Sequence, residues 1–283
     1  MTTSTREQHP GIGVAAGVPY VAFPPAGGAR ADAPVVVAWH LMDAPRTERA
    51  FAAAVPLAGL DAWRIYLGLP MTGARLPAGG YEELMQLGFA DAVLHLHGPV
   101  TQQAVAEFPA AYAQLRDELG FGDGPLAVVG GSIGSAVAQL VALEAEPSVR
   151  AAVLISPVVE LAPVVTALSK QFGVTYEWSD ASRAVAARLD FVARADEFAT
   201  RGAPAVLLVV GEHDDVDGFR APARRLQAAL ADRYADGARA KVAVVPGMAH
   251  SLAEEPGEDP APQTPHAAEV DQLAVDWLRR HLG

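Results

Sequence analysis

Residues 126–135 read Leu-Ala-Val-Val-Gly-Gly-Ser-Ile-Gly-Ser, and this stretch decides the fold. Four apolar residues, typical of a buried β-strand, precede a serine framed by glycines, and a helical pattern begins at Ile133. Gly130, Ser132 and Gly134 match the G-x-S-x-G motif, a tight strand–turn–helix that raises the serine oxygen above the sheet. Side chains at the glycines would crowd the facing chain. The motif therefore predicts a nucleophile at Ser132, although an ordinary strand-to-helix link can have the same composition.

Strand-like and helix-like patterns alternate along most of the chain. Near-continuous apolar strands between helices indicate an α/β fold, a doubly wound, mostly parallel sheet covered on both faces. A Pro/Gly loop of hairpin length joins the first two strands, which we expect to form an antiparallel edge. The predicted strands are 18–23, 34–39, 62–67, 126–129, 149–155, 205–210 and 241–245, and the predicted helices are 47–57, 101–119, 133–144, 218–232 and 267–282.

The length of 283 residues suits one large α/β domain or two small ones. The alternation favours a single domain spanning residues 1–283. Residues 156–203 interrupt the alternation with prolines, an aromatic group and a helix near 181–198, and we expect a small helical cap there. The aromatic residues Phe172, Tyr176 and Trp178 either line a substrate pocket or pack the cap.

Composition and charge limit the classes of binding partner and the cellular compartments that the chain is expected to have. The chain has no cysteine, which excludes disulfides and cysteine nucleophiles, and its net charge of −12 disfavours nucleic acids and anionic membranes. No apolar run approaches the ~20 residues of a membrane span. Residues 1–11 are polar and lack the apolar core of a signal peptide, so we expect a cytoplasmic protein. Self-association is left open.

Polar residues follow three predicted strands in an order that suggests catalysis. Ser132 comes after 126–129, Asp214 and Asp215 come after 205–210, and His250 comes after 241–245. The carboxyl ends of parallel strands meet at one edge of a sheet, where active sites gather. A serine hydroxyl needs a base to accept its proton, and an aspartate orients that base.

These motifs over residues 12–282 resemble the α/β-hydrolase superfamily, which implies a sheet of about eight strands. The resemblance places the acid at Asp214, with Asp215 as its rival, beside Ser132 and His250. It also implies an oxyanion hole formed by the N–H groups of Ile133 and Met42. The sequence departs from the family pattern at Leu41, which replaces the usual glycine, so the N–H of Leu41 is an alternative donor and its side chain a pocket candidate.

The resemblance implies a serine hydrolase that cleaves esters or thioesters of small to medium apolar acids and needs no cofactor. The same triad serves carbon–carbon bond hydrolysis, amide hydrolysis and acyl transfer, and the fold also serves ligand-binding proteins without activity. His95 and His97 have the alternation of two metal ligands on a strand, but no third ligand accompanies them. We expect a small-molecule substrate and no metal site.

Overall fold

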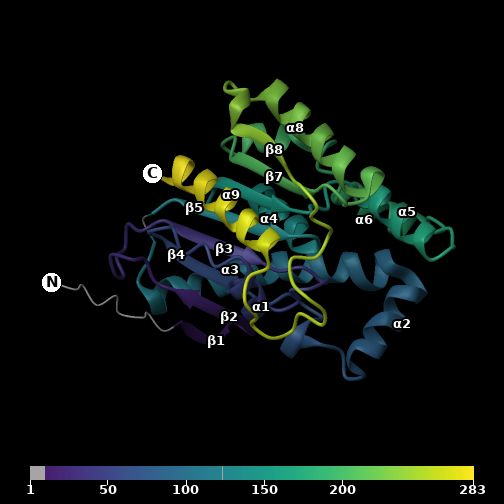
Figure 1. Ribbon diagram of the computed structural model, residues 1–283, viewed down its shortest axis with the longest axis horizontal. Helices are drawn as coiled ribbons and strands as arrows, with labels where there is room; N and C mark the ends of the chain where they lie inside the picture. Colours follow the sequence, from purple (N-terminus) through teal and green to yellow (C-terminus); the bar gives the residue numbers. More distant parts are fainter. Residues whose placement is uncertain (1–9, 123) are drawn as a thin grey trace.

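A mixed sheet of eight strands forms the centre of the computed structural model, which describes residues 10–122 and 124–283 (Figure 1). The order across the sheet is β1-β2-β4-β3-β5-β6-β7-β8. The strands are β1 Gly11–Ala15, β2 Val18–Phe23, β3 Val35–Trp39, β4 Trp63–Leu67, β5 Leu126–Gly131, β6 Val149–Ile155, β7 Ala205–Gly211 and β8 Ala240–Val245. The predicted α/β fold is confirmed. Residues 1–9, on which the cytoplasmic interpretation largely depends, lie outside the described part.

The antiparallel edge differs from the sequence-based expectation. β2 lies between β1 and β4 and runs antiparallel to both, whereas β3 is parallel to β4 and β5 in the interior of the sheet. The expected pairing of 18–23 with 34–39 was therefore wrong. The tight turn at Ala16 and Gly17, both with positive φ, closes the actual hairpin between β1 and β2.

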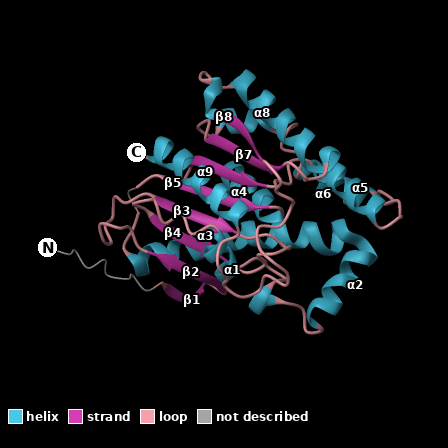
Figure 2. Cartoon of the chain, in the orientation of Figure 1, coloured by secondary structure: helices cyan, strands magenta, loops and turns pink. Residues whose placement is uncertain are grey.

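Helices cover both faces of the sheet because the side chains of each strand alternate between two apolar layers. In β3, Val35, Val37 and Trp39 belong to one layer, and Val36 and Ala38 belong to the other. The first layer packs against α3, α4 and α8 on one face of the sheet, and the second packs against α1 and α9 on the other face (Figure 2). These helices are α1 Glu48–Ala54, α3 Gly98–Leu119, α4 Ile133–Glu144, α8 Ala221–Arg233 and α9 Pro265–Leu282.

Two helical segments project beyond the carboxyl ends of the strands (Figure 1). The first contains the 3₁₀ turn η1 Gly73–Arg75, the helix α2 Gly80–Ala92 and the π-helix η2 Val93–His97; the second contains α5 Leu161–Gln171 and α6 Asp180–Arg188. The helix α7 Ala195–Thr200 that follows packs against α4 and α8 on one face of the sheet. The sequence-based prediction missed β1, α2 and α5, and it placed one helix where α6 and α7 lie. His95 and His97 lie in the π-helix η2 rather than on a strand. Among the described helices, none is long and apolar enough to span a bilayer.

Candidate active site

Ser132 occupies a strained turn between β5 and α4. Its φ of +47° lies in the left-handed region that non-glycine residues rarely adopt. A Cβ atom on Gly130 would lie 2.2 Å from the carbonyl oxygen of Gly134, and a Cβ on Gly134 would lie 2.4 Å from the carbonyl oxygen of His40. Both obstacles are backbone atoms that cannot rotate away. The crowding that the motif predicted therefore accounts for both glycines.

His250 lies between Ser132 and Asp214. Its Nε2 is 2.9 Å from the Oγ of Ser132, and its Nδ1 is 2.8 Å from the Oδ1 of Asp214. With Nδ1–H donating to the carboxylate, Nε2 is free to accept the serine proton. The sheet brings these residues together because β3, β5, β6, β7 and β8 are parallel and end at the same edge.

The carboxylate of Asp214 is buried and fully hydrogen-bonded. Its Oδ2 accepts hydrogen bonds from the backbone N–H of Gly211 and from the hydroxyl of Ser156, each at 2.8 Å. Burial alone would raise the pKa of Asp214, but the hydrogen bond and charge of His250, with these two donors, hold it below the usual value. The site therefore keeps an ionised carboxylate behind the imidazole.

The geometry distinguishes between the two candidate acids. Asp215 accepts a hydrogen bond at 2.7 Å from the backbone N–H of Gly218 and caps the π-helix η3 Val216–Arg220. His250 bonds only to Asp214 of these two neighbours. The short side chain of Asp215 thus serves the turn that follows the acid.

Two supporting residues were missed in the sequence. Ser156, at the end of β6, is fully buried and binds Asp214 through its hydroxyl. The ring of Phe219 in η3 lies 4.5 Å from the imidazole of His250. Ser156 follows a strand as the other site residues do, so the same rule would have found it. Phe219 gave no comparable signal, because its position depends on the π-helix.

Of the predicted oxyanion donors, Ile133 directly follows the serine, and Met42 precedes Asp43, which lies 3.7 Å from His250. The N–H groups of Ile133 and Met42 take part in no hydrogen bond within the described residues. Leu41 is fully buried, and its side chain lies against Gly131 in the layer under α1 and α9. Leu41 therefore supports the turn from the core instead of facing solvent in a pocket.

His40 fixes the start of this loop. Its buried ring accepts a hydrogen bond at Nε2 from the N–H of Leu69 at 3.1 Å, so Nδ1 carries the proton and donates to the carbonyl oxygen of Leu41 at 2.5 Å. Burial lowers the pKa of His40 to about 4. The ring is therefore neutral and holds the loop in one conformation.

The loop that follows β8 is tied to the loop that follows β3. The N–H of Leu252 donates to the carbonyl of Ala44 at 2.9 Å, and the N–H of Arg46 donates to the carbonyl of Gly257 at 2.8 Å. The hydroxyl of Thr47 donates to the carbonyl of Glu258, and the Arg46 guanidinium pairs with Glu255. The loops carrying His250 and Met42 are therefore held as one unit.

The predicted aromatic pocket residues lie on the projecting segments. Tyr176 packs edge-on against Trp178 with ring centroids 4.8 Å apart, and its hydroxyl donates to Asp91 at 2.6 Å. Phe172 packs edge-on against Phe89 at 5.7 Å, although both rings are largely exposed. These contacts join the two segments to each other. None of them links an aromatic residue directly to Ser132, His250 or Asp214 among the described residues.

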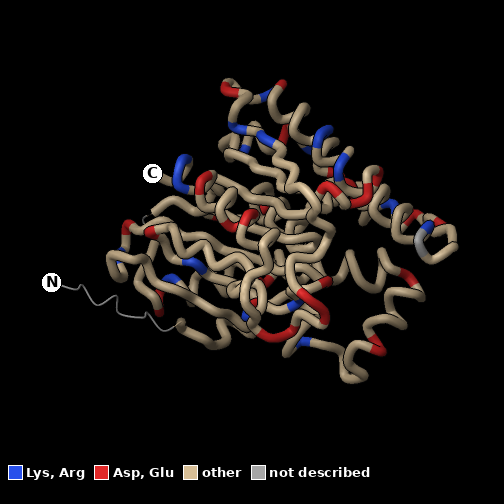
Figure 3. Tube along the Cα trace, viewed as in Figure 1, with Lys and Arg blue, Asp and Glu red and all other residues tan. Residues whose placement is uncertain are grey.

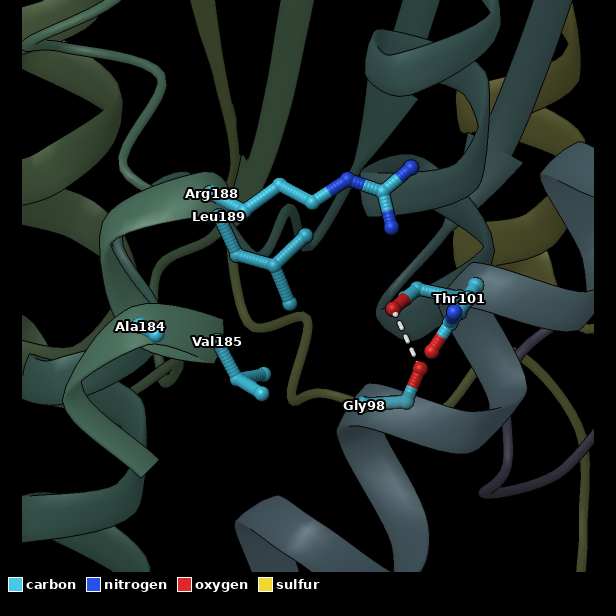
Figure 4. A pocket seen from close by; sticks show the side chains of 7 residues that line it. Gly98, Thr101, Ala184, Val185, Arg188 and Leu189 are labelled. Atoms are coloured by element: carbon cyan, nitrogen blue, oxygen red, sulfur yellow. Dashed lines mark hydrogen bonds between the residues drawn. The ribbon is translucent and has the colours of Figure 1, made fainter. Parts of the chain in front are cut away.

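A cavity of about 260 Å³ lies between α3 and α6 (Figure 4). Its lining is Gly98, Thr101, Gln102, Ala184, Val185, Arg188 and Leu189. The hydroxyl of Thr101 is occupied by the carbonyls of His97 and Gly98, and Arg188 pairs with Glu144. The cavity contains none of the predicted site residues.

A mostly parallel sheet with a hydrogen-bonded serine, histidine and aspartate at its carboxyl edge defines the α/β-hydrolase class of protein. A family model described as alpha/beta hydrolase fold matches residues 99–254. The chain belongs to this family and is a hydrolase, as the sequence motifs predicted. No curated protein sequence matches the chain.

Several solved structures share the fold. The protein TT1662 from Thermus thermophilus is 17% identical with a TM-score of 0.65, over 98% of this chain and 98% of that one. Carboxyl esterase 2 from the fungus Tuber melanosporum is 18% identical with a TM-score of 0.59, over 100% and 89%. A puromycin-hydrolyzing peptidase from Mycobacterium tuberculosis is 20% identical with a TM-score of 0.63, over 100% of this chain and 40% of that one. At these identities the likeness concerns the fold.

Proposed function

We propose that this hydrolase cleaves carboxylic esters or thioesters of small to medium apolar acids through an acyl-enzyme on Ser132. The main support for this proposal is the series of hydrogen bonds from Ser132 through His250 to the buried Asp214. The occurrence of esterases among the structures of the same fold supports the ester class. We further propose a single domain spanning residues 1–283, with 156–203 as a small cap.

In the proposed reaction, Ser132 Oγ attacks the carbonyl carbon while its proton passes to Nε2 of His250. Asp214 stabilises the imidazolium that forms. The oxyanion accepts hydrogen bonds from the N–H groups of Ile133 and Met42, with Leu41 as the alternative to Met42. His250 then gives its proton to the departing alcohol or thiol, and a water activated by His250 releases the acid. No metal or organic cofactor takes part in these steps.

Intact-mass spectrometry after treatment with a fluorophosphonate tests the activated serine. We expect one adduct on the wild-type protein and none on Ser132→Ala, because only a serine with an adjacent base attacks the phosphorus at a useful rate. The variant Ser148→Ala is the control, since Ser148 is an exposed serine just before β6, at the opposite edge of the sheet, and it should keep the adduct. Absence of the adduct on the wild type would favour the alternative of a ligand-binding protein.

Substrate turnover then distinguishes the ester reaction from its rivals. A p-nitrophenyl ester series from acetate to octanoate should be hydrolysed, with the highest kcat/KM at short or intermediate chains. Faster turnover of a vinylogous diketone, an anilide or an added acyl acceptor would instead assign carbon–carbon bond hydrolysis, amide hydrolysis or acyl transfer to the same residues.

A further inference from the structure

A second carboxylate lies beside the imidazole, on the side opposite Asp214. Asp43 follows Met42 in the loop after β3, and its Oδ2 is 3.7 Å from Nε2 of His250. This separation is beyond hydrogen-bond distance. Asp214 already orients the ring through Nδ1, so Asp43 is not needed to hold the base. Its side chain is 55% exposed, so it can meet a substrate.

Asp43 has no basic partner among the described residues other than the histidine. The nearest arginine in its loop, Arg46, is paired with Glu255 and lies over the ring of Tyr81 at 5.3 Å. The loop after β8 adds further acidic residues, seen as red segments along it in Figure 3. Within the described residues, no arginine or lysine forms an ion pair with Asp43, so its carboxylate adds negative charge beside Nε2.

The position of Asp43 indicates which part of a substrate it meets. Nε2 of His250 delivers the proton to the departing oxygen or sulfur, so the leaving group must lie within reach of this nitrogen. Asp43 Oδ2 lies 3.7 Å from the same nitrogen, so its carboxylate is within reach of a charge carried by the leaving group. This placement leaves the acyl side free to be apolar.

We propose that Asp43 selects substrates whose alcohol or thiol part carries a positive charge, such as an ammonium group. The inference rests on the proposed ester or thioester hydrolysis. An ammonium close to Asp43 gains a favourable Coulomb interaction in the complex, and an anionic leaving group is repelled. The acidic surface of the protein attracts the same substrates during encounter.

Two isosteric thioesters test this selection. Butyrylthiocholine and S-(3,3-dimethylbutyl) thiobutyrate share the acyl group and the shape of the leaving group, and they differ only in a quaternary nitrogen in place of a carbon. The wild-type protein should favour the cationic ester in kcat/KM by about threefold to fivefold, as expected for a half-exposed charge pair. About 0.5 M NaCl should reduce this preference through screening.

In Asp43→Asn the preference should fall to near unity. Any effect of the substitution on His250 applies to both substrates and cancels in their ratio. Glu254→Gln is a matched control, because it removes one exposed charge from the neighbouring loop and should keep the wild-type ratio. Asp43→Ser serves as a second variant, and thermal unfolding verifies that each variant is folded.

The possible outcomes separate the two proposals. A wild-type preference for the neutral ester, or an unchanged ratio in both Asp43 variants, would overturn the role of Asp43 while leaving ester hydrolysis intact. An equal loss of preference in Glu254→Gln would assign it to the general field of the protein and also overturn the inference. Failure of the wild type to hydrolyse either thioester would overturn the inference, and the p-nitrophenyl ester series would then show separately whether the proposed ester hydrolysis stands.

Discussion

Two regions are held by different kinds of contact: the carboxyl edge of the sheet where Ser132, His250 and Asp214 meet, here called the inner edge, and the two projecting helical segments. At the inner edge the turn of Ser132 is fixed by backbone atoms in close approach, and Asp214 is buried with its oxygens hydrogen-bonded. On the segments, Phe89 and Phe172 remain 69% and 58% exposed although their rings touch. The difference teaches that the reacting groups depend on tight packing, whereas the surfaces around them depend on a few exposed contacts.

The largest contrast should come from adding one methyl group in each region. Gly134→Ala places a Cβ 2.4 Å from a backbone oxygen at the inner edge, whereas Gly88→Ala in α2 places one at an ordinary 3.6 Å from the Leu96 side chain. We expect Gly134→Ala to cost about 3 kcal/mol of unfolding free energy and most of the activity. Gly88→Ala should be neutral or stabilising by up to about 1 kcal/mol. Urea denaturation measures both.

Similar losses in the two glycine variants would show that the segments are packed as tightly as the inner edge. Full activity of Gly134→Ala would show that the turn of Ser132 can relax, and the inner edge would then not be more tightly packed than the segments.

The turn of Ser132 was predictable because its geometry admits few residues. Strand ends followed by Ser132, Asp214 and His250 were visible in the chain, and the parallel sheet then dictated their meeting. The choice of Asp214 over Asp215 came from the family resemblance, and the structure adds a physical reason, the capping of η3 by Asp215.

A smaller effect concerns the pH dependence of the unfolding free energy, to which two buried histidines contribute. His40 at the inner edge and His97 in η2 both have their pKa lowered to about 4 by burial, but the Nδ1 of His97 has no hydrogen-bond partner. Each is neutral when folded and takes a proton below pH 6.5 when unfolded. Their contribution to stability is therefore complete above pH 6.5 and is lost as the pH falls from 6.5 towards 4.

We expect His97→Leu to reduce the loss of unfolding free energy between pH 7 and pH 5 by on the order of 2 kcal/mol. The variant also removes an unpartnered buried nitrogen, so it should not be less stable than the wild type at pH 7. His95→Leu, at an exposed position of the same turn, should keep the wild-type pH dependence. Chemical denaturation at the two pH values gives the comparison, and an unchanged slope in His97→Leu would mean that His97 is charged in the folded protein.

The smallest effect on stability should come from the exposed aromatic contact between the segments. Phe172→Ala should change the unfolding free energy by less than about 1 kcal/mol, because the ring is mostly solvated. If Phe172 contacts the acyl chain, KM for p-nitrophenyl octanoate should rise about twofold or threefold while KM for the acetate stays constant. Ile12→Ala, exposed on the distant edge strand β1, is the control. Equal changes for both esters would indicate a purely structural contact.

The sequence was least informative where long-range contacts decide the structure. The pairing of β2 with β4, 40 or more residues further along the chain, could not be read from a short loop that favoured β3. The sequence also did not show what the aromatic residues near 172–178 contact. Only their partners, Phe89 for Phe172 and Asp91 for Tyr176, show that this group joins the two segments. The burial of Leu41 depends in the same way on Gly131 in another strand.

The hydrogen bonds between the loops after β3 and β8 have a consequence for the synthesis of the chain. Ser132 and the loop that holds Met42 leave the ribosome long before His250 and the carbonyls of Gly257 and Glu258 that clamp this loop. A nascent chain therefore carries Ser132 without His250 and without the hydrogen bonds that residues 44–47 receive from the loop after β8. In the proposed reaction cleavage requires His250, so a chain that ends before β8 would be inert toward esters.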